Sequence, residues 1–246
     1  MYEIMGARVH AVSQGEGDPV VILHGWGSSR AVMRPIALRL AESGRRVVTL
    51  DFPGFGSSPP PPAAWGVPEY AEMLTKLLDR MGLCRPVLIG HSFGGRVILY
   101  AVGALKYPAD RLVLIDSAGI KQPPSRRRFG FAAAKRLAAL LPKKAREALL
   151  AKARRKYGSA DYLAAEGVMR EVLVKTVNHD LADLLPDIEN EALLIWGSAD
   201  TATPVADGRR MASLMQNARI EVIEGAGHYA FLDAPEKFFT ILESWL

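Results

Sequence analysis

The sequence holds a single cysteine among its 246 residues, Cys84, so no disulfide can form within the chain. Cys84 precedes an apolar segment and has no base or site signature beside it, and we expect it to be a buried structural thiol. No apolar stretch approaches the roughly 20 residues of a membrane-spanning helix, so no transmembrane segment is expected. The first residues alternate polar and apolar and lack the features of a secretory signal. We therefore expect a soluble, cytoplasmic protein.

Motifs for metals, cofactors and nucleic acids are missing as well. No ligand spacing typical of a metal site occurs, and the glycine-rich turn at residues 90–94 lacks the G-x-G-x-x-G spacing of dinucleotide-binding loops. The sequence therefore predicts a protein without a cofactor or a metal. Nucleic acid is not expected as a partner, because no known binding motif accompanies the basic residues.

Acidic residues are nearly absent from one segment of the chain. Residues 121–156 contain 13 Lys and Arg against a single acid, Glu147, and carry +12. Because the whole chain carries +5, the remainder carries −7. A solvated outer face is the simplest interpretation of such a segment. The alternative is contact with an anionic partner, either an acidic carrier protein or a lipid surface.

The remaining chain alternates short apolar runs with longer segments of helical spacing, which predicts an α/β doubly wound sheet. The predicted strands cover residues 20–23, 47–50, 87–89, 112–115, 192–196 and 220–223. The predicted helices cover residues 31–42, 68–81, 95–106, 205–215 and 235–245.

Residues 120–186 break this alternation, because they contain about three helical segments and no strand-like run. We expect a helical lid there, inserted into a core domain formed by residues 1–119 and 187–246. Pro142 fits the start of one lid helix. Ser159 or Asp161 fits the N-cap of the next.

The strongest chemical signal is Gly90-His91-Ser92-Phe93-Gly94, a G-x-S-x-G motif between a predicted strand and a predicted helix. A serine on so sharp a turn needs small neighbours, and its hydroxyl then stands clear of the sheet. We expect Ser92 to be the nucleophile. The backbone N–H of Phe93, at the start of the helix, is expected to face the oxyanion of the substrate.

A second glycine-rich loop, His24-Gly25-Trp26-Gly27, follows the first buried strand. It can bring the backbone N–H of Trp26 close to Ser92 as the second donor of an oxyanion hole. His24 is interpreted as the residue that anchors this loop. The substrate pocket is expected to be bordered by His24 and Gly25 and by the lid residues Phe129, Phe131 and Leu137.

Two polar side chains near the C-terminus complete the constellation. Asp200 follows a strand end, where open α/β sheets place functional groups, and it is the expected acid. His228, in Gly-Ala-Gly-His, is the expected base, since an imidazole titrates near neutrality. Asp116 also follows a strand and is the alternative acid, otherwise a turn or helix-cap carboxylate. Asp51 is expected to stabilise its own loop.

Together, these four ordered motifs resemble those of the α/β-hydrolase superfamily over the whole chain outside the lid. The resemblance implies an eight-stranded, mostly parallel sheet with a helical cap after the sixth strand. It also implies a nucleophile elbow at Ser92 and an oxyanion hole formed by Trp26 and Phe93. Residues 51–58 resemble the loop after the fourth strand in lipases, esterases and carbon–carbon hydrolases. Because the elbow carries serine rather than aspartate, haloalkane dehalogenase and epoxide hydrolase activities are not expected.

The resemblance implies acyl transfer to water, and a carboxylic ester of small to medium acyl chain is the expected substrate. The loop at residues 24–27 resembles that of carboxylesterases acting on pimeloyl-carrier-protein methyl esters, which keeps the acidic carrier protein among the possible partners. Two alternatives stay open: a carbon–carbon hydrolase of vinylogous diketones, and a non-catalytic binding protein on the same fold.

Overall fold

A computed structural model of the chain describes residues 1–121, 126–157 and 159–246. Its centre is an eight-stranded sheet with the strand order β1-β2-β4-β3-β5-β6-β7-β8. The strands are β1 (Tyr2–Ile4), β2 (Ala7–Gln14), β3 (Pro19–Leu23), β4 (Arg46–Asp51), β5 (Val87–His91), β6 (Arg111–Ile115), β7 (Glu191–Gly197) and β8 (Ala218–Ile223). Only the pairings of β1 with β2 and of β2 with β4 are antiparallel among these strands. The predicted eight-stranded, mostly parallel sheet is confirmed.

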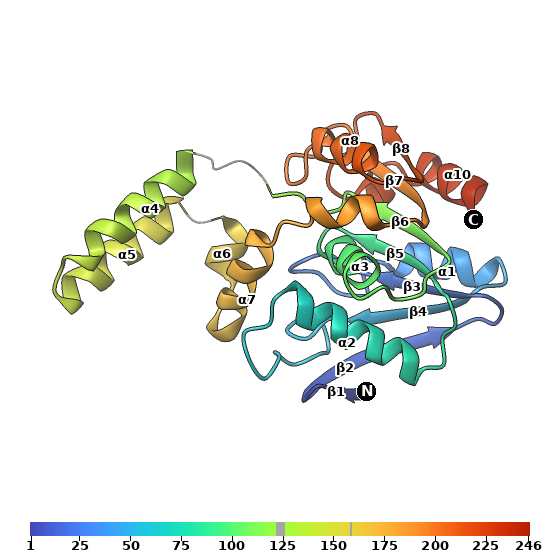
Figure 1. The fold of residues 1–246 in the computed structure, drawn as a ribbon, viewed down its shortest axis with the longest axis horizontal. Helices are drawn as coiled ribbons and strands as arrows, with labels where there is room; N and C mark the ends of the chain where they lie inside the picture. The colour runs from blue at the N-terminus through green and yellow to red at the C-terminus, as the bar shows by residue number, and fades with distance from the viewer. Residues whose placement is uncertain (122–125, 158) are drawn as a thin grey trace.

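Helices cover both faces of the sheet (Figure 1), which explains why the central strands are continuous runs of Val, Ile and Leu. On one face pack α2 (Val67–Arg80), α3 (Phe93–Gly103) and α8 (Val205–Leu214). On the other face pack α1 (Arg34–Glu42), α9 (Ala230–Asp233) and α10 (Pro235–Trp245). The five helices predicted for the core are all present, with ends that move by up to three residues.

Between β6 and β7 the chain forms further helices, as the sequence predicts. They are α4 (Arg126–Ala139), α5 (Lys143–Tyr157), α6 (Ala160–Ala164), α7 (Gly167–Asn178) and the 3-10 helix η1 (Ala182–Asp187). α4 and α5 form an antiparallel pair that extends away from the sheet (Figure 1). Ser159 is the N-cap of α6, where its Oγ accepts a hydrogen bond from the N–H of Tyr162 at 3.2 Å.

The prediction of a buried Cys84 is wrong, because the side chain is exposed. Cys84 lies in the turn between α2 and β5, where Leu83 is buried and Arg85 has a φ of +43°. The inward side of this turn is already occupied by Leu83, so the next side chain faces the solvent. No helix in the described part of the chain is long and apolar enough to cross a membrane.

Candidate active site

Ser92 occupies the sharp turn between β5 and α3, with φ of +48° and ψ of −109°. Glycine is required on both sides for steric reasons. A Cβ at position 90 would lie 2.5 Å from the backbone N of Gly95, and one at position 94 would lie 2.6 Å from the carbonyl oxygen of Leu23. Such distances to backbone atoms are far below van der Waals contact, so any larger residue at either position would force the backbone of the elbow to shift.

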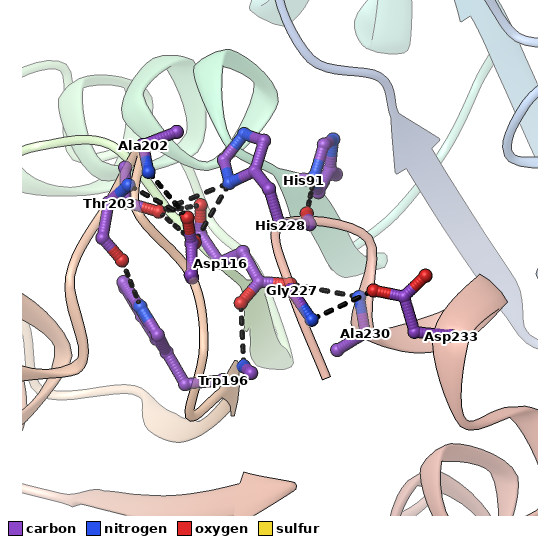
Figure 2. A network of polar contacts seen from close by, with 11 residues as sticks. His91, Asp116, Trp196, Ala202, Thr203, Gly227, His228, Ala230 and Asp233 are labelled. Carbon is purple, nitrogen blue, oxygen red and sulfur yellow. Dashed lines mark hydrogen bonds and ion pairs between the residues drawn. The ribbon is translucent and has the colours of Figure 1, made fainter. Parts of the chain in front are cut away.

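His228 and Asp200 meet beyond the ends of β7 and β8. Nδ1 of His228 lies 2.8 Å from Oδ2 of Asp200, whose side chain is fully buried. The same carboxylate accepts hydrogen bonds from the N–H of Ala202 (2.7 Å) and from the N–H and Oγ1 of Thr203 (3.1 and 2.6 Å). Figure 2 shows this polar network around His228 and Thr203. Nothing in the sequence pattern singled out Thr203, because its contact with Asp200 depends on the tight turn between them.

The charge on Asp200 is favoured by these contacts. Burial by itself raises the pKa of the Asp200 carboxyl, but the hydrogen bonds from His228 and Thr203 outweigh burial and hold the pKa below its ordinary value. An ionised carboxylate can only accept hydrogen bonds, so Nδ1 of His228 carries the proton and donates it in the hydrogen bond to Asp200. Nε2 of the imidazole is then the nitrogen that can accept a proton.

Asp116, the alternative acid, has other partners. Its Oδ1 accepts from the N–H of Gly197 at 2.8 Å and its Oδ2 from the N–H of Ala230, the first residue of α9, at 3.2 Å. Burial raises the pKa of Asp116 to about 7, although both hydrogen bonds act in the opposite direction. Asp116 therefore joins three chain segments and caps α9, while His228 is hydrogen-bonded to Asp200.

The loop carrying Trp26 lies directly against the elbow. A Cβ on Gly25 would lie 2.7 Å from Nδ1 of His91 and 3.2 Å from Cβ of Ser92, so only glycine permits this approach. The ring of Trp26 packs edge-on against that of Phe93, with centroids 5.7 Å apart. Both residues line the same cavity as Ser92 and His228.

His24 has a structural role, and its predicted place in the pocket wall is wrong. The ring is fully buried behind the loop, and its Nε2 accepts a hydrogen bond from the N–H of Phe52 at 3.0 Å. Burial lowers the pKa of His24 to about 4, so the imidazole is neutral. His24 is absent from the cavity lining because this anchoring bond turns it toward β4. Asp51 stabilises its loop as predicted, accepting hydrogen bonds from the N–H groups of Arg30 and Ser57.

The cavity that Ser92 and His228 share has a volume of about 860 Å³. Of the pocket residues predicted from the sequence, Gly25 and Phe131 line it. Leu137 does not, because it lies on the outer side of α4 and is 60% exposed. The side chain of Phe129 lies outside the described residues. The wall also includes side chains that the sequence did not reveal, among them Arg96, Tyr162, Leu173 and Val177.

His91 holds the loop that carries His228. Its Nε2 lies 2.7 Å from the carbonyl oxygen of His228, and burial lowers the pKa of His91 to about 3, so the neutral ring donates this hydrogen bond. The N–H of Gly227 donates to Asp233 at 2.8 Å. The loop is therefore held on both sides of the His228 side chain. No cluster of potential metal ligands is present among the described residues.

The sequence and the fold are similar to those of known proteins. A family profile described as "Alpha/beta hydrolase family" matches residues 20–241. The pimeloyl-[acyl-carrier protein] methyl ester esterase of Shewanella woodyi is 29% identical over 98% of this chain and 99% of its own length. The 2-hydroxymuconate semialdehyde hydrolase of Pseudomonas putida is 27% identical over 98% and 91%, respectively. The structure of an esterase from Exiguobacterium antarcticum matches with a TM-score of 0.79, at 22% identity, over 99% of this chain and 97% of that one.

Proposed function

Because the chain belongs to the alpha/beta hydrolase family, we propose that it is a serine hydrolase that cleaves carboxylic esters of small to medium acyl chains. One observation carries the proposal. His228, which is paired with the buried Asp200, opens onto the same cavity of about 860 Å³ as Ser92, and Ser92 stands on a strained turn at the cavity wall. A nucleophile, a base and an acid that orients the base are the three groups that acyl transfer requires.

In the proposed reaction, Oγ of Ser92 attacks the ester carbonyl carbon while Nε2 of His228 takes the hydroxyl proton. Asp200 stabilises the imidazolium that forms. The N–H groups of Trp26 and Phe93 stabilise the oxyanion, and each such donor contributes about 3 kcal/mol to the transition state. The imidazolium then returns its proton to the leaving alcohol, and a water molecule, activated in the same way, hydrolyses the acyl-enzyme.

We assign residues 120–186 to a cap that selects the substrate, on a core of residues 1–119 and 187–246. α4, α6 and α7 contribute Phe131, Tyr162 and Leu173 to the cavity wall, so acyl groups contact both parts. An anionic carrier protein or lipid surface at the basic part of this cap stays a prediction.

The second candidate is hydrolysis of a carbon–carbon bond in vinylogous diketones. The similarity to the 2-hydroxymuconate semialdehyde hydrolase favours it, and the same nucleophile, base and acid would serve. A non-catalytic binding protein is the least favoured alternative, since it gives no reason for the pairing of His228 with Asp200.

The test is hydrolysis of p-nitrophenyl esters, from acetate to palmitate, by the wild-type protein and by Ser92→Ala at neutral pH. We expect the kcat/KM of the wild-type protein to be highest for short and medium acyl chains. We expect Ser92→Ala to lower kcat/KM by at least about a thousandfold. A vinylogous diketone is measured in parallel. The ratio of kcat/KM for the diketone to kcat/KM for the best ester decides between carbon–carbon hydrolysis and ester hydrolysis. Equal rates in both proteins would refute Ser92 as the nucleophile, and labelling by a fluorophosphonate would identify the residue that reacts instead.

A further inference from the structure

A buried cation faces the cavity one helical turn beyond the nucleophile. Arg96 lies four residues after Ser92 on α3, is 7% exposed and lines the cavity. Four residues advance a helix by about 6 Å, so the guanidinium and the Ser92 hydroxyl belong to neighbouring parts of one wall. Lys135, Asp161 and Asp207 are the other Lys, Arg, Asp or Glu residues in the described lining, and each is more exposed than Arg96.

Among the described residues, the Arg96 guanidinium donates hydrogen bonds through Nη1 alone. Nη1 donates to the carbonyl oxygens of Thr176 (2.7 Å) and His179 (2.5 Å) at the C-terminal end of α7. Among the described residues, no hydrogen bond involves Nε or Nη2, and no carboxylate lies within 4.0 Å of the group. Neither nitrogen is among the fully buried polar atoms that lack a partner, and Arg96 lines the cavity, which is consistent with an Nε–Nη2 edge that faces it.

Burying the charged Arg96 guanidinium with these partners costs free energy unless an anion also binds to it. Burial lowers the pKa of Arg96 to about 10, with Asp180 acting in the opposite direction, so the group stays charged at neutral pH. A buried charge whose direct partners are only carbonyl oxygens has lost hydration without gaining a carboxylate in direct contact. The free Nε–Nη2 edge is the geometry that binds a carboxylate through two parallel hydrogen bonds.

We infer that Arg96 binds a carboxylate of the substrate, so that the preferred esters carry an ionised carboxyl group a few bonds from the scissile carbonyl. The inference rests on the proposed ester hydrolysis and adds its substrate class. The carboxylate belongs either to the acyl chain, as in the monoester of a short dicarboxylic acid, or to the alcohol, as in an ester of a hydroxy acid.

The experiment compares each acidic ester with its amide, which has the same shape without the charge. The pairs are monomethyl glutarate with methyl glutaramate, for the acyl side, and O-butyrylglycolate with O-butyrylglycolamide, for the alcohol side. The readout is the kcat/KM of the acid divided by that of the amide, at pH 7.5. We expect Arg96→Met to lower this ratio about ten- to a hundredfold in one of the pairs, as for the loss of hydrogen bonds to a charged group, and Arg96→Lys to recover part of it.

Lys175→Met is the matched control. Lys175 is also a cation that holds α7 through a backbone carbonyl, that of Ala64, but it does not line the cavity. Its loss is expected to leave both ratios unchanged. Ratios that stay unchanged in Arg96→Met, or that fall equally in Lys175→Met, would show that Arg96 only holds α7 and would overturn the inference.

Binding to the wild-type protein decides the question if Arg96→Met does not fold. Glutarate is expected to inhibit p-nitrophenyl butyrate hydrolysis at least about tenfold more strongly than glutaramide. Equal inhibition constants would refute the carboxylate site. If no ester is hydrolysed at all, the proposed function fails. Calorimetric binding of glutarate to Ser92→Ala, tighter than that of glutaramide, would then still support the Arg96 site, and equal binding would refute it.

Discussion

At the scale of single residues, the two carboxylates beyond the strand ends are distinguished by their hydrogen-bond donors. Both oxygens of Asp116 are held by backbone N–H groups, those of Gly197 and Ala230. Asp200 instead accepts from His228 through Oδ2 and from the turn at Thr203. The difference is one of partners more than of burial, because both side chains are shielded from water. The partners favour a structural task for Asp116 and support the proposal that Asp200 orients His228.

Substitution by asparagine is expected to separate these tasks. Asp200→Asn should lower kcat by roughly 10⁴, because an amide neither stabilises the imidazolium nor holds the productive tautomer. Asp116→Asn should lower the free energy of unfolding by about 1–3 kcal/mol, because its amide nitrogen cannot accept a backbone N–H, while kcat of the folded protein changes little. Ester kinetics and denaturant unfolding of both variants provide the measurement. A larger loss of kcat in Asp116→Asn would make Asp116 the acid.

At the scale of elements, the sequence predicted what depends on local chemistry. The buried strands were recognisable as apolar runs, and the elbow as glycines flanking Ser92, since both constraints act within a few residues. Contacts that depend on tertiary packing could not be predicted from such local patterns. Tyr162 and Val177 line the cavity only because α6 and α7 fold back over it, and Arg96 was hidden inside an otherwise apolar helix. The exposure of Cys84 likewise depends on which side chain of its turn packs inward.

The steric need for glycine beside Ser92 can be tested by substitution. Gly94→Ala is expected to cost about 3 kcal/mol of unfolding free energy, because the new Cβ would overlap the carbonyl group of Leu23 at the end of β3. Gly82→Ala is the control: its φ is +65° but no atom lies within 4 Å of its Cβ position, so only backbone strain of about 1 kcal/mol is expected. Denaturant unfolding measures both. Equal losses would mean that the elbow relaxes and that backbone conformation alone sets the cost.

At the scale of the whole molecule, the segment with helices α4 and α5 differs from the rest of the chain in its charge and in its packing. Residues 121–156 carry +12, while the rest of the chain carries −7. α4 and α5 pack mainly against each other, with Ala138 and Ala153 buried, and they extend from the body (Figure 1). The strands on either side of this insertion are hydrogen-bonded neighbours, since β6 pairs with β7 from Arg111 to Ile115. A break in the insertion should therefore leave the sheet intact.

Limited digestion with trypsin is expected to cut α4 and α5 before any other part of the chain. Their exposed cations include Lys143, Lys144 and Arg146, and helices that lack a large core open locally at low free energy cost. The two fragments should appear on a denaturing gel, yet elute together at the size of the intact 26.8 kDa chain, because the pairing of β6 with β7 holds them. Fragments that separate under native conditions would contradict this prediction, since they would show that the sheet depends on a continuous insertion. First cuts at strand-end arginines such as Arg46 would show instead that the α4–α5 pair is as stable as the core.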